Sequence, residues 1–144
     1  MHLWHLHPVI VHFPIALLLT GCGLRVLNHF VKQNSLTFAI RILLVLGVLG
    51  LSLAVASGFL AYHTAPHVPD AWEVQYEHKQ LGLWSLALGI VLLGWSLWRG
   101  NAFDPLAWTE PVELGLWIVL AGFILATGWH GGQLVFVYGT GVVK

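Results

Sequence analysis

The sequence predicts an all-α fold, a transmembrane up-and-down four-helix bundle with a short extended C-terminal tail. Two observations lead to this fold class. Of the 144 residues, 58% are hydrophobic and 8% are charged, and the mean hydropathy is +0.80. Four apolar segments are each long enough to cross the bilayer, because about 20 helical residues span roughly 30 Å of hydrocarbon. Too little polar surface remains for a soluble globule, so we expect an integral membrane protein.

We expect one membrane domain, residues 1–144, with helices at about 8–30, 38–62, 77–98 and 112–130. Pro8 suits the first turn of the first helix, where a missing N–H costs nothing. The other prolines near segment ends fall in the second and third connections, at Pro66, Pro69, Pro105 and Pro111. Residues 131–144 are rich in glycine, valine and aromatic residues, a composition that predicts an extended or turning tail.

Composition also excludes several classes of function. The formal net charge is zero and the basic residues are scattered, so the chain lacks the basic patch of a nucleic-acid-binding protein. The single cysteine, Cys22, excludes thiolate clusters, and with Met1 as the only methionine a thioether ligand is not expected. Nine histidines make imidazole the abundant ligand.

Four antiparallel helices place both termini and the 63–76 connection on one side of the membrane. The opposite side carries four basic residues against two, Arg25, Lys32, Arg41 and Arg99 against Lys79 and Lys144. Because cytoplasmic segments carry the excess of Lys and Arg, we expect the termini on the periplasmic side of a bacterial inner membrane.

Four histidines, one from each helix, should meet at the periplasmic end: His12, His63, His78 and His130. By depth, His12 and His78 form an inner tier and His63 and His130 an outer one, and each tier joins diagonal helices. A single interfacial histidine is more often a hydrogen-bonding residue than a ligand, but convergence from four helices favours a bound cofactor or metal. His7 lies at the expected N-cap position, where it serves as a hydrogen-bonding residue or an alternate ligand.

Diagonal imidazole pairs suit haem b, whose iron takes two axial ligands on opposite faces. The residues predicted to bind this haem are His12, His78, His63, His130, Gly58, Gly82, Gly128 and Lys79. The glycines leave room for a flat macrocycle, although small residues also serve helix packing. Lys79 either pairs with a propionate or extends to the interface. We slightly favour His12 and His78 as the axial pair.

These features predict a b-type cytochrome-like electron-transfer protein rather than a stand-alone enzyme, exchanging electrons with a quinol or a periplasmic c-type cytochrome. Two alternatives stay open. Copper or zinc at His12, His63, His78, His130 and, less favoured, His7 would make a metal-binding membrane protein, with carboxylates nearby in the 63–78 segment. A non-catalytic subunit of a larger redox or photosynthetic complex would use the apolar surface to contact other membrane subunits.

Four stretches resemble one known family. They are LHPVIVHFPIALLLTG at 6–21, SGFLAYH at 57–63, EHKQLGL at 77–83 and HGGQLVFVYGTGV at 130–142. Together they are similar to the DUF2231 family of small four-helix bacterial membrane proteins, whose HP-x-x-V-H-F-P-I signature is intact from His7 to Ile15. Family members that occur beside or fused to c-type cytochrome domains imply a link to periplasmic redox chains. That link is an analogy of context.

Overall fold

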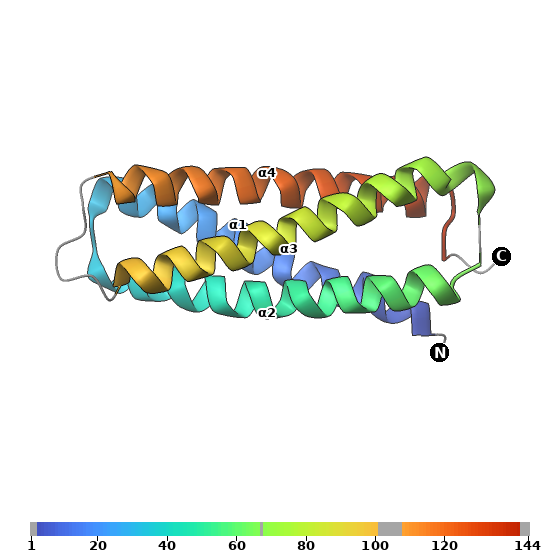
Figure 1. Ribbon diagram of the computed structural model, residues 1–144, viewed down its shortest axis with the longest axis horizontal. Helices are drawn as coiled ribbons and strands as arrows, with labels where there is room; N and C mark the ends of the chain where they lie inside the picture. The colour runs from blue at the N-terminus through green and yellow to red at the C-terminus, as the bar shows by residue number, and fades with distance from the viewer. Residues whose placement is uncertain (1–2, 67, 101–107, 142–144) are drawn as a thin grey trace.

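The computed structural model describes residues 3–66, 68–100 and 108–141, which form an antiparallel four-helix bundle (Figure 1). A 3₁₀ turn at Leu3–His5 leads into α1 (Leu6–Val31), followed by α2 (Asn34–Thr64). A second 3₁₀ turn at Pro69–Ala71 leads into α3 (Trp72–Gly100), and α4 is Thr109–Phe136. All four helices are long and apolar enough to cross a membrane. The predicted all-α bundle is confirmed.

The helices exceed the predicted bounds at both ends, most of all in α4. Residues 131–136, expected to be extended, continue α4 to Phe136 instead. Beyond it the chain turns back over the last helical turn, where Thr140 N–H donates to Leu134 O at 2.8 Å and Gly139 N–H to Val135 O at 3.1 Å. Gly139 has φ 64°, which suits glycine. The predicted end of the helix at residue 130 is therefore six residues too early, and the turn begins only after Phe136.

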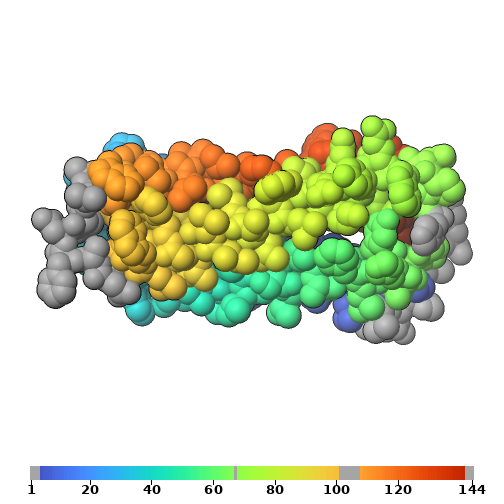
Figure 2. All heavy atoms as spheres, in the orientation of Figure 1, coloured from blue at the N-terminus to red at the C-terminus, as the bar shows by residue number. Residues whose placement is uncertain are grey.

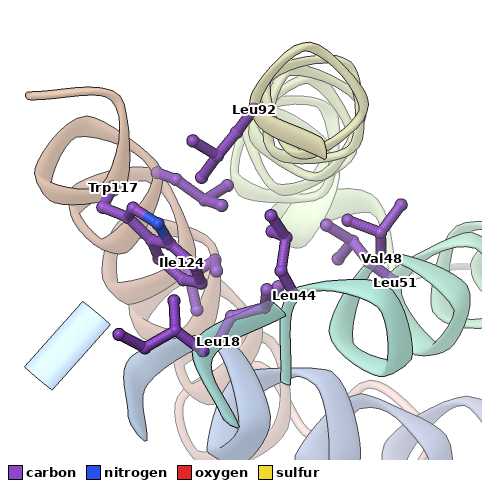
Figure 3. Close-up of a cluster of buried hydrophobic side chains, with 9 residues drawn as sticks. Leu18, Leu44, Val48, Leu51, Leu92, Trp117 and Ile124 are labelled. Atoms are coloured by element: carbon purple, nitrogen blue, oxygen red, sulfur yellow. The ribbon is translucent and has the colours of Figure 1, made fainter. Parts of the chain in front are cut away.

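Close helix packing at glycines builds the core (Figure 3). A Cβ on Gly47 of α2 would lie 2.5 Å from a methyl carbon of Leu18 on α1, and one on Gly21 would lie 2.7 Å from the Trp117 ring on α4. Leu18 and Trp117 are 1% and 0% exposed. These glycines therefore let one large side chain on each facing helix fill the bundle axis.

The two helical hairpins, α1–α2 and α3–α4, repeat one another. Buried positions of α1 recur in α3 71 residues later, pairing Pro14, Leu18, Gly21 and Arg25 with Ser85, Gly89, Leu92 and Ser96. Buried positions of α2 recur in α4 73 residues later, pairing Ile40, Leu44, Gly47 and Leu51 with Glu113, Trp117, Leu120 and Ile124. Helix contacts run from α1 to α2, α3, α4 and back to α1. The bundle is thus approximately twofold symmetric about its long axis.

Candidate functional site

Two imidazoles face each other across the bundle diagonal at the end that holds both termini, which we call the histidine end. His7 extends from the first turn of α1 and His78 from the second turn of α3. Their ring centroids are 6.0 Å apart and their planes are inclined by 81°. The two residues occupy equivalent positions in the repeat, so the pair lies where the symmetry axis passes between the hairpins.

Each imidazole is held by the second helix of its own hairpin. His7 Nδ1 lies 3.0 Å from Ala54 O and 3.2 Å from Ser57 Oγ on α2. His78 Nδ1 lies 3.0 Å from Thr127 O on α4. A carbonyl oxygen only accepts, so each Nδ1–H must donate and each neutral ring keeps the lone pair of Nε2 free. This is how ligating histidines are oriented by their surroundings.

Each imidazole ring also lies against a glycine of the helix that supplies its carbonyl partner. A Cβ on Gly58 would be 3.1 Å from His7 Cε1, and a Cβ on Gly131 would be 3.1 Å from His78 Cε1. Each glycine follows its carbonyl residue, Ala54 or Thr127, by one helical turn. Gly58, which the sequence analysis predicted to contact a haem, thus lies against His7, and Gly131, which the sequence analysis did not single out, lies against His78 in the same way.

The structure does not bring His12 and His63 to this pair. The His12 side chain is exposed on the outer face of α1, where its Nδ1 donates to Pro8 O at 2.6 Å. His7, and not His12 as predicted, therefore faces His78. His63 lies exposed at the end of α2, with its ring edge-on to Tyr62 at 5.3 Å.

His130 lies beside the pair with both ring nitrogens already in contact with oxygen atoms. Its Nδ1 donates to Ala126 O at 2.8 Å, and its Nε2 lies 3.1 Å from Glu77 Oε2. The contact with Glu77 links α4 to α3. In this arrangement His130 neighbours the site rather than completing it.

The remaining predicted site residues lie around the pair at greater distance. Lys79 Nζ lies over the rings of Tyr62 and Tyr76, 5.1 and 5.4 Å from their centroids. A Cβ on Gly82 would meet only Thr127, at 4.0 Å, and one on Gly128 would meet nothing within 4 Å. These glycines do not contact the two imidazoles.

The number of side chains available as ligands can be compared with the number that each candidate cofactor requires. Within the described ranges, no three His, Cys, Asp or Glu side chains gather to hold a metal ion. Zinc takes four ligands, three or four of them from protein, whereas haem iron takes two axial ligands. Figure 2 shows an opening between α2 and α3 in the half nearer the histidine end. His7 and His78 together supply two imidazoles, the number of axial ligands that a haem iron takes.

A second polar cluster lies at the opposite end of the bundle, which we call the arginine end. The sequence analysis did not predict this cluster, because it used the basic residues only to infer the membrane orientation. Arg25 of α1 is 5% exposed and lies 3.7 Å from both Glu110 and Glu113 of α4. Arg99 of α3 forms an ion pair with Glu113, which is 7% exposed. The partners are more than ten residues apart in sequence, so no local pattern reveals them.

A heptad signal identifies His7 in retrospect. His7, Pro14, Gly21 and Asn28 recur every seventh residue along α1, and the last three are buried. His12 follows His7 by five residues, which turns it about 140° away at 3.6 residues per turn. Helix α3 shows the same register in His78, Ser85, Leu92 and Arg99. Comparing the two helices would have paired His7 with His78.

One comparison with known proteins gives a match. The family model described as "Predicted membrane protein (DUF2231)" matches residues 4–144. Neither a curated protein nor a solved structure matches the chain. The match covers the described histidine pair and the whole bundle, in agreement with the four membrane-spanning helices. The chain belongs to the DUF2231 family of membrane proteins.

Proposed function

We propose that this protein is a membrane-embedded, b-type cytochrome-like electron-transfer protein whose haem is ligated by His7 and His78. One observation carries the proposal: equivalent imidazoles from diagonal helices face each other at 6.0 Å with each Nδ1 bonded to a backbone carbonyl. Two histidine ligands at about 2 Å from one metal place their ring centroids roughly 6 Å apart. The separation and the free Nε2 atoms both suit axial ligation.

The chain's own residues account for the rest of the proposed site. Ala54 O and Thr127 O fix the tautomers and limit ring rotation, so little reorganisation accompanies ligation. Gly58 and Gly131 let the rings lie close to the helix backbones. A haem bound here would supply one-electron redox chemistry.

We further propose that the histidine end faces the periplasm of a bacterial inner membrane. Arg25, Lys32, Arg41 and Arg99 lie at the other end, and the positive-inside bias puts that end in the cytoplasm. A site near the periplasmic surface is within reach of a quinol or a c-type cytochrome. The cytoplasmic half offers only His29, so electron transfer across the whole bilayer needs another protein.

An optical spectrum of the purified protein, reduced minus oxidised, tests the proposal, with iron, copper and zinc measured on the same sample. The proposal predicts a sharp reduced α-band and one iron per chain. A featureless spectrum with stoichiometric copper would instead identify the copper alternative. A featureless spectrum without metal would leave the subunit of a larger complex as the remaining interpretation.

A further inference from the structure

A cavity of about 400 Å³ opens between the four helices at the arginine end. Four cationic side chains line it, Arg25, Lys32, Arg41 and Arg99. Two carboxylates face them, Glu110 and Glu113. Among the described residues, the lining therefore carries an excess of two positive charges. A polar, positively charged hollow between membrane helices favours an anionic ligand.

Arg41 and Lys32 are the two cations of the lining that the described acids leave unpaired. Both carboxylates are engaged by other residues, since Glu113 pairs with Arg25 and Arg99, and Glu110 with Arg25 and His29. Among the described residues no hydrogen bond or ion pair involves Arg41. Its guanidinium lies against Gly100, where any Cβ would displace it. No described side chain accepts from its five N–H donors, which suit a phosphate.

The same arginine borders a second, apolar hollow. This groove of about 220 Å³ is lined by Arg41, Ile42, Val45 and Leu46 on α2. The three apolar side chains are 43%, 38% and 42% exposed, so they face outward along the helix. Arg41 thus lies at the junction of a basic cavity and an apolar groove that runs toward the middle of the bilayer.

We infer that Arg41 binds the phosphate of an anionic phospholipid, with the headgroup in the basic cavity and an acyl chain along Ile42, Val45 and Leu46. The charge excess selects an anion, and the adjoining groove selects one that carries a hydrocarbon chain. A free phosphate has the same headgroup chemistry but gains nothing from the groove. This site is separate from the histidine pair and does not depend on a haem.

Native mass spectrometry of the full-length protein, extracted from bilayers of equal phosphatidylglycerol and phosphatidylcholine, tests the inference. Arg41→Gln removes the phosphate ligand, and Val45→Trp fills the groove without changing charge. Lys79→Gln is the matched control, because it removes one charge at the other end. We expect wild type and the control to retain phosphatidylglycerol selectively, and Arg41→Gln to lower its retention about tenfold, as for one lost charge-assisted contact. Val45→Trp should lower it several-fold.

Three outcomes would overturn the inference. Retention of both lipids in equal amounts would mean that the site does not select an anion. Unchanged retention in Arg41→Gln would mean that this residue is not the ligand. Loss in Arg41→Gln but not in Val45→Trp, together with displacement by inorganic phosphate, would identify a soluble anion as the ligand instead of a lipid. Gel filtration of each variant checks that it remains folded.

Discussion

The two ends of the bundle use its internal repeat in opposite ways. At the histidine end, the facing imidazoles and the glycines against them are the same residue in both hairpins, His7 and His78, Gly58 and Gly131, although the carbonyl residues Ala54 and Thr127 differ. At the arginine end the equivalent positions hold different residues, and Arg25 corresponds to Ser96 while Ile40 corresponds to Glu113. Identical residues on both sides of a twofold axis suit a ligand with two equivalent faces. Unlike residues suit charge pairing between the hairpins.

The two ends also differ in whether their polar contacts lie within one hairpin or between the two hairpins. At the histidine end each imidazole bonds within its own hairpin, His7 to Ala54 and His78 to Thr127. At the arginine end Arg25 of the first hairpin pairs with Glu110 and Glu113 of the second. The arginine end therefore joins the hairpins by ion pairs, whereas at the histidine end the two hairpins meet through the edge-to-face contact of His7 and His78.

The largest expected change in stability comes from removing the buried ion pairs at the arginine end. Glu113→Gln leaves Arg25 and Arg99 without their shared buried carboxylate, and removing one partner of a buried pair costs about 3–5 kcal/mol. We expect that loss in the free energy of unfolding, measured by denaturant titration in detergent. Glu73→Gln, an exposed acid in the first turn of α3, is the control. Equal stability of the two variants would show that the buried pairing does not join the hairpins.

A smaller loss is expected where helices touch in the middle of the bundle. Gly47→Ala places a Cβ 2.5 Å from Leu18, and overpacking of this kind costs about 1–3 kcal/mol. Gly23→Ala meets nothing within 4 Å and should be neutral or slightly stabilising, because alanine favours helix. The same unfolding titration compares them. If Gly47→Ala were as stable as Gly23→Ala, the close approach of α1 and α2 would be in doubt.

The symmetry of the histidine end predicts matched effects from two substitutions. Gly58→Ala and Gly131→Ala each bring a Cβ within 3.1 Å of an imidazole carbon, so each ring must shift by a few tenths of an ångström. We expect each to weaken haem binding by about 1 kcal/mol, or roughly fivefold, measured by haem titration of the apoprotein. Gly128→Ala, which meets nothing nearby, should have no effect. A large effect from only one of the pair would argue against equivalent axial ligands.

The smallest effect is expected at Glu77. Its side chain is 51% exposed, and exposed ion pairs contribute about 0–1 kcal/mol. Glu77→Gln should therefore change the unfolding free energy by less than about 1 kcal/mol and leave any haem spectrum unchanged. A lost or altered spectrum in this variant would return His130 to the ligand set.

The four helices could be predicted because the bilayer demands about 20 apolar residues per span, and all four segments meet that demand. The site was harder to predict. His78 follows from convergence at one end and Gly58 was noted for its closeness in sequence to His63, but His12 was preferred to His7 because helix 1 was expected to begin two residues later than Leu6. The ion pairs of Glu113 escaped prediction because they join residues from three helices.

The most direct test of the axial pair compares three variants expressed where haem is plentiful: His7→Ala, His78→Ala and His12→Ala. Haem content per chain and the low-spin optical spectrum are measured for each, with wild type alongside. We expect His7→Ala and His78→Ala to lose the low-spin haem and His12→Ala to keep it, because His12 faces outward. Retention in His7→Ala with loss in His12→Ala would show that His7 is not a ligand, and wild type without haem would show that the pair does not bind haem.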